Sequence, residues 1–149
     1  YFDARVPVSL GSDSQTQINL LEDARELEYH IRLQRKERNV LTPPDNHGRS
    51  ALAGRLFECA TSNGARSIGH EAGSISVGAP ADFFTVDLDD PSIAGSSLDD
   101  LLTSIVFSLS RAAVRDVVVA GKQIVKDGLH AEQVEIIEKF KDLQARIWN

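Results

Sequence analysis

The stretch Val8-Ser9-Leu10-Gly11-Ser12-Asp13-Ser14 places a short apolar segment directly before a tight polar loop. Residues 6–10 are apolar and β-favouring, which is typical of a buried strand, and the glycine and serines end it. We therefore expect Asp13 at the carboxyl end of a strand. A carboxylate held there can bind a metal ion through one oxygen and accept a proton on the other. Gly-Ser-Asp-Ser also forms Asx turns and helix N-caps, so the tetrapeptide alone leaves both interpretations open.

Two helical segments follow this strand. Apolar residues recur at helical spacing over residues 19–38, with acidic residues early and basic residues late, as the helix dipole favours. Ser50 can cap a second helix, which Asn63-Gly64 would close. A single strand followed by helices cannot bury its own edges. The first third of the chain therefore needs partner strands that the sequence does not contain.

The rest of the chain is richer in β-structure and ends in a helix. Apolar residues at helical spacing predict an amphipathic terminal helix, with Phe140 and Trp148 as its anchors against the β-sandwich. A hairpin around Gly121 is predicted from the two β-favouring runs that flank it. The expected elements before the terminal helix are strands at 74–77 and 83–88, a helix at 98–109, and hairpin strands at 114–120 and 123–125.

Composition narrows the classes of partner. The chain has 149 residues, a net charge of −6 and a pI near 5.1, so it has no electrostatic footprint for nucleic acid or an anionic membrane. No apolar stretch approaches the roughly 18 residues of a membrane span. The single cysteine, Cys59, excludes an internal disulfide and fits a reducing, cytoplasmic setting. Methionine is absent, so we expect the chain to be part of a longer polypeptide.

Three stretches in this order resemble the amidohydrolase superfamily of metal-dependent hydrolases: residues 8–14, residues 73–83 (GSISVGAPADF) and residues 114–128 (VRDVVVAGKQIVKDG). The resemblance implies an α/β plus β fold. Residues 1–68 would be the end of a (β/α)₈ TIM-like barrel, with its last strand, metal-ligand loop and helices. Residues 69–149 would be the C-terminal part of a composite β-sandwich with a terminal helix.

Within that superfamily, residues 20–41 and 90–95 are similar to the formimidoylglutamate deiminase subgroup. The resemblance implies hydrolysis of a C–N bond in a small molecule with release of ammonia, in the histidine-degradation pathway. It makes Asp13 a ligand of one divalent metal ion, zinc with iron or manganese as alternatives, and also the proton shuttle. The other ligands would come from an N-terminal barrel portion of the same protein. The resemblance also admits a homodimer.

The functional alternatives are another amidohydrolase acting on a purine, pyrimidine or triazine ring, and a truncated, inactive remnant with a structural role. Ser12 and Ser14 could hydrogen-bond the Asp13 carboxylate or line the pocket, and loop solvation explains them equally well. Several other residues have simpler explanations. Arg25, Arg32 and Arg35 could attract a dicarboxylate, but a solvated helix face explains them better. The four histidines show no ligand spacing and are interpreted as surface or turn residues, and Cys59 as buried and inert: His30, His47, His70 and His130.

Overall fold

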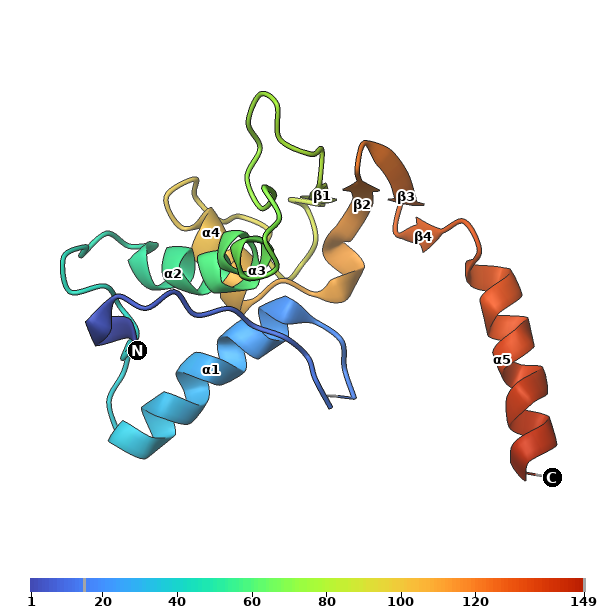
Figure 1. Ribbon diagram of the computed structural model, residues 1–149, viewed down its shortest axis with the longest axis horizontal. Helices are drawn as coiled ribbons and strands as arrows, with labels where there is room; N and C mark the ends of the chain where they lie inside the picture. Colours follow the sequence, from blue (N-terminus) through green and yellow to red (C-terminus); the bar gives the residue numbers. More distant parts are fainter. Residues whose placement is uncertain (15, 149) are drawn as a thin grey trace.

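The computed structural model describes residues 1–14 and 16–148, which form a helical layer, a small sheet and a projecting terminal helix (Figure 1). One 3₁₀ turn opens the chain, and another precedes the second strand. No helix among the described residues is long and apolar enough to cross a membrane. In chain order the elements are η1 (Phe2–Ala4), α1 (Leu20–Arg35), α2 (Ala51–Ala60), α3 (Ser62–Ser67), β1 (Phe83–Val86), α4 (Leu101–Phe107), η2 (Arg111–Ala113), β2 (Val114–Val119), β3 (Lys122–Lys126), β4 (Leu129–His130) and α5 (Gln133–Trp148).

Helix α1 begins and ends where local chemistry dictates. The Asn19 side chain accepts hydrogen bonds from the backbone N–H groups of Leu21 (3.1 Å) and Glu22 (3.4 Å), which have no partner inside the helix. Lys36 adopts a left-handed conformation (φ 56°) and ends the helix. The predicted helix is confirmed, but it stops at Arg35 instead of residue 38.

The helical layer encloses the main core. Apolar side chains from α1, α2 and α4 meet there, together with Leu41 from the segment after α1. Leu56 and Val106 are fully buried. Although α4 lies in the second half of the chain, it packs on α1 and α2, beside the N-terminal segments. The division at residue 68 stays a prediction.

A charged residue, Glu28, is also buried in this layer. It is fully buried, and its two carboxylate oxygens accept the backbone N–H groups of Val40 and Leu41, each at 3.0 Å. Arg32 lies one turn further along α1, 3.4 Å from the same carboxylate. Hydrogen bonds therefore compensate the buried charge and hold the chain that follows α1 against the core.

The sheet is antiparallel, in the order β1-β2-β3-β4. The hairpin of β2 and β3 is confirmed, and its two-residue turn has positive φ at both Ala120 (49°) and Gly121 (76°). Positive φ at both central positions is the geometry that fits the twist of a hairpin. Strand β4 has only two residues and was not predicted.

Two predicted strands are wrong. Residues 6–10 run extended but pair with no strand; instead Leu10 N–H donates to the Cys59 carbonyl, and the Asn63 amide donates to the Val8 carbonyl. Residues 74–77 form bends and turns, with Ile75 and Val77 exposed. An extended segment becomes a strand only beside another strand, and among the described residues neither segment has one.

Two predicted helix boundaries are also wrong in detail. Asn63 and Gly64 lie inside α3, because the helical path breaks two residues earlier, at Thr61. Ser50 does stand at the start of α2, but its hydroxyl donates to the Asp99 carbonyl (2.6 Å) and does not cap the helix. The Ser50 hydroxyl therefore bonds to the distant Asp99 carbonyl and not to a backbone N–H of the first turn of α2. Helix α4 is shorter than predicted, spanning seven residues.

The terminal helix α5 is confirmed as a helix, but its predicted anchoring is wrong. Phe140 and Trp148 are 57% and 78% exposed, and α5 has no buried residue. In Figure 1 the helix projects away from both the helical layer and the sheet. The apolar pattern of α5 is regular, yet within the described residues no surface covers it.

Candidate functional site

Asp13 lies in an exposed turn that follows the extended segment 6–10. Its backbone is left-handed, with φ 41°, a conformation that Asp adopts more readily than most residues. Among the described residues no hydrogen bond engages its carboxylate, and the N-cap of α1 is Asn19. The helix-cap alternative for Asp13 is therefore wrong, and the carboxylate is free to take a ligand.

The Asp13 turn and one side of α1 line an open hollow of about 420 Å³. Asp23, Glu26 and His30 reach this hollow from α1, since residues three and four apart share a helix face. The His30 ring lies 3.2 Å from the Glu26 carboxylate. One oxygen of Asp23 is buried without a partner among the described residues. The hollow therefore places acidic side chains of α1 on the same side of the molecule as the Asp13 turn, without bringing them together as a metal site among the described residues.

The interpretation of His30 as a surface residue is confirmed, since its side chain is 70% exposed, but the sequence did not show that it lies beside the Asp13 turn. The spacing of Asp23, Leu27 and His30 on one face of α1 was a usable signal, but nothing local in the sequence shows that the Asp13 turn packs there. Ser12 is half-buried and Ser14 exposed in the same turn. Their proposed role as supports of the Asp13 carboxylate stays a prediction.

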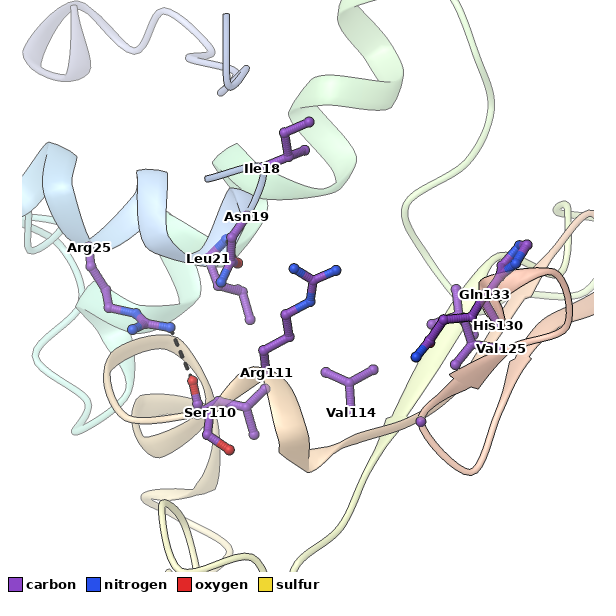
Figure 2. A pocket seen from close by; sticks show the side chains of 13 residues that line it. Ile18, Asn19, Leu21, Arg25, Ser110, Arg111, Val114, Val125, His130 and Gln133 are labelled. Atoms are coloured by element: carbon purple, nitrogen blue, oxygen red, sulfur yellow. Dashed lines mark hydrogen bonds between the residues drawn. The ribbon is translucent and has the colours of Figure 1, made fainter. Parts of the chain in front are cut away.

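Arg25 serves the fold, and its predicted solvated face is wrong. Its Nε donates to the Val106 carbonyl at 2.7 Å and one Nη to the Leu109 carbonyl at 3.3 Å, the bond dashed in Figure 2. The other Nη lies 2.9 Å from Glu22. The guanidinium thus satisfies carbonyls at the end of α4, where helix acceptors lack partners. It cannot serve a substrate carboxylate at the same time.

Figure 2 shows a second hollow, at the junction of the α1 N-terminus, η2 and the sheet. Leu21, Val114 and Val125 form its apolar wall, and Arg111 extends across it. The side chains there do not include Asp13. This hollow is therefore a junction between the helical layer and the sheet.

Cys59, Arg32 and the other three histidines lie outside the hollow beside Asp13. Cys59 is buried, which confirms the prediction of its burial. That burial raises the pKa of its thiol and so favours the protonated, less reactive form. Arg32 pairs with Glu28 one turn earlier on α1, as an i, i+4 interpretation requires. His47, His70 and His130 line different hollows from Asp13 and from one another.

Two exposed or half-buried carboxylates organise loops. Asp90 accepts the hydroxyl and N–H of Ser92 and the Ser110 hydroxyl, and the bonds from Ser92 hold its pKa below the usual range. Asp116 accepts the Asp127 N–H first, then Thr85 and Gln123, and its pKa is lowered in the same way. Hydrogen bonds to the charged form cause both shifts. These hydrogen-bond networks connect segments that are distant in the sequence, and so they stabilise the fold.

The donor groups of the described residues do not form a complete metal centre. No group of three or more His, Cys, Asp or Glu side chains converges within residues 1–14 and 16–148. Asp13 has the right donor atom and the right exposure for one zinc ligand, but a zinc site needs about four. Asp13 therefore has the chemistry of one zinc ligand, and the described residues do not bring further ligands to it.

Comparison with known proteins identifies the family. The sequence profile of the amidohydrolase family matches residues 2–124, well over half of the chain. The chain belongs to the amidohydrolase family. This membership confirms the resemblance that residues 8–14, 73–83 and 114–128 suggested.

Two relatives of known name are similar to most of this chain. The formimidoylglutamate deiminase of Pseudomonas aeruginosa is 38% identical over 134 residues, covering 89% of this amidohydrolase chain and 29% of the relative. The 5-methylthioadenosine/S-adenosylhomocysteine deaminase 1 of Archaeoglobus fulgidus is 30% identical over 149 residues, covering 97% of this chain and 33% of that protein. The chain thus spans about a third of the length of the relatives it matches.

Solved structures agree with this placement. The amidohydrolase from Brucella melitensis is 26% identical, with a TM-score of 0.79 over 99% of this chain and 32% of its own. A zinc-bound adenosine deaminase from Xanthomonas campestris has a TM-score of 0.78 at 23% identity, over 98% of this chain and 32% of its own, which shows the fold alone. The chain therefore has the fold of about a third of each of these structures.

Proposed function

We propose that this chain is the C-terminal part of a zinc-dependent enzyme that hydrolyses N-formimidoyl-L-glutamate to N-formyl-L-glutamate and ammonia. The observation that carries the proposal is the 38% identity to a formimidoylglutamate deiminase over 89% of the chain. The proposal assigns the enzyme to histidine degradation in the cytoplasm. It assigns the remaining metal ligands to a barrel portion outside this chain, and admits a homodimer.

Asp13 has two tasks in this proposal. One carboxylate oxygen would hold the divalent metal, and the other would accept the proton of the attacking water and donate it to the departing nitrogen. Bound zinc would lower the pKa of water enough to supply hydroxide at neutral pH. The exposed, unpartnered carboxylate of Asp13 supports both tasks, and Ser12 and Ser14 would orient it.

The test of the site is Asp13→Asn in the protein that carries the whole barrel. Asparagine keeps the size but removes the charge and the proton acceptor. We expect turnover to fall beyond the roughly 10²–10⁴-fold typical of lost acid–base help, because metal placement suffers too. Ammonia release and bound zinc are the two measurements. Asp45→Asn, in an exposed loop, is the matched control; near-normal turnover with Asn at position 13 would contradict the assignment.

The test of the substrate is competition. A pocket with buried polar partners for the glutamate carboxylates rejects ligands that leave those partners unpaired, typically by about 10⁴. The enzyme should therefore release ammonia from N-formimidoyl-L-glutamate far faster than from guanine, cytosine or a triazine. A ring base that outpaces the linear amidine would move the function to ring deamination.

Ring deamination is the second candidate because a relative named as a 5-methylthioadenosine/S-adenosylhomocysteine deaminase matches 97% of the chain.

The third candidate is an inactive structural remnant. The gene sequence upstream of Tyr1 distinguishes this candidate from an enzyme. A His-x-His segment on a predicted strand upstream would support the enzyme. Residues 1–149 alone should bind zinc weakly and release no ammonia; one tightly held zinc per chain in equilibrium dialysis would contradict the shared ligand set.

A further inference from the structure

Helix α5 presents a broad apolar face with no described surface against it. At 100° per residue, the apolar side chains spread over roughly 140° of the helix circumference, interrupted by Gln133 and Gln144. These side chains are 43–78% exposed. An exposed apolar face of this width on an amphipathic helix indicates a contact surface. The members of the face are Ile136, Ile137, Phe140, Leu143, Ile147 and Trp148.

The width of this face identifies the shape of its partner. A two-stranded coiled coil uses a narrow seam, here Ile136, Phe140, Leu143 and Ile147, and would leave Ile137 and Trp148 in water. In an antiparallel pair of two copies, Lys139 of one would also face Arg146 of the other, which is repulsive. A broad, concave surface of a globular protein fits the face better than a second copy of α5 does.

The margin of the face identifies the charge of its partner. Lys139 and Arg146 lie along the edge next to Leu143. Lys139 is paired with Glu135 at 2.5 Å, whereas Arg146 forms no ion pair with any described residue. A carboxylate at the rim of the partner surface would complement Arg146.

Comparison with a solved amidohydrolase indicates which part of the protein could provide the surface that covers α5. The Brucella melitensis amidohydrolase aligns with 99% of this chain, α5 included, and about two thirds of that structure lies outside the alignment. We infer that α5 docks, within the same polypeptide, on an apolar groove with an acidic rim in the barrel portion that this chain does not contain. The inference rests on the proposed function only in assuming the longer amidohydrolase chain.

The test is hydrogen exchange of the α5 amides in the zinc-loaded protein that carries the barrel. Phe140→Ala with Leu143→Ala should raise their exchange about a hundredfold, since each change deletes buried contacts while alanine favours the helix. Glu138→Ala with Asp142→Ala, on the side of α5 opposite the apolar face, is the matched control and should change exchange by less than about threefold. Arg146→Glu, which keeps the apolar face, should raise exchange about tenfold.

Three outcomes would overturn the inference: unprotected α5 amides in the wild-type protein, equal effects of the apolar pair and its control, or conversion of a dimer to a monomer by the apolar pair in sedimentation velocity. The last outcome would assign the face to a second copy. Activity is read separately. Protected α5 amides in a protein that prefers a ring base would refute the proposed substrate and still support the docking of α5.

Discussion

The helices of the helical layer and the terminal helix α5 have equally regular apolar patterns, but the layer buries its apolar residues and α5 leaves them exposed. In the layer, Leu56 and Val106 are fully buried because α1, α2 and α4 present apolar faces to one another. In α5 no residue is buried. The pattern of a helix therefore predicts which face will be covered, whereas burial itself depends on whether the chain contains the second surface. Residues 1–14 and 16–148 supply that second surface for the layer and not for α5.

The largest expected effect tests this contrast directly. Leu56→Ala in residues 1–149 should lower the free energy of unfolding by about 2–5 kcal/mol, because it leaves a cavity in the core. Leu143→Ala, the same change on α5, should alter it by less than about 0.5 kcal/mol, since Leu143 is 43% exposed. Urea unfolding followed by circular dichroism measures both. Equal losses would show that α5 is packed in this chain after all.

A smaller loss is expected from Glu28→Gln within the layer. Gln keeps one acceptor but turns an N–H donor toward a backbone N–H, so a buried donor of Val40 or Leu41 loses its partner. An unpartnered buried group costs about 1–3 kcal/mol. Glu37→Gln, an exposed change of the same kind just beyond α1, is the control for urea unfolding. Unchanged stability in Glu28→Gln would mean that this carboxylate does not hold the segment after α1.

What could be predicted from the sequence follows the range of the interactions involved. Helix α1 and the hairpin at Gly121 were predictable because an N-cap, a turn glycine and periodic apolar residues act over a few positions. The strand expected at residues 6–10 was not formed, since its pairing depends on other strands. The burial of Glu28 was missed because its partners lie 12 and 13 residues away. Asp13 was singled out by resemblance, and its neighbours on α1 only by the structure.

Acid should loosen the sheet through Asp116. Its pKa is lowered in the folded protein, chiefly by the Asp127 N–H and then by Thr85, so the charged form stabilises the fold above the unfolded value of about 3.8. That contribution is lost as the pH falls through the lower, folded value. NMR signals of the Gln123 side-chain amide should report the titration, and Asp116→Asn should abolish it. A Gln123 amide that titrates unchanged in the Asn variant would contradict this assignment.

The smallest effect concerns the turn of the hairpin, where local conformation alone decides the outcome. Ala120 has φ 49°, which is unfavourable for a residue with a Cβ, whereas Asn tolerates it and Asn-Gly is the preferred pair at such turns. The Ala120 N–H donates to Asp82 at 2.6 Å, a bond that every substitution but proline retains. Ala120→Asn should therefore stabilise residues 1–149 by a few tenths to about 1 kcal/mol. Ala120→Val, β-branched at positive φ, should destabilise by about 1 kcal/mol or more. The two substitutions should shift the urea midpoint of unfolding in opposite directions. Shifts in the same direction would mean that packing around the turn, and not its backbone conformation, sets the stability of this region.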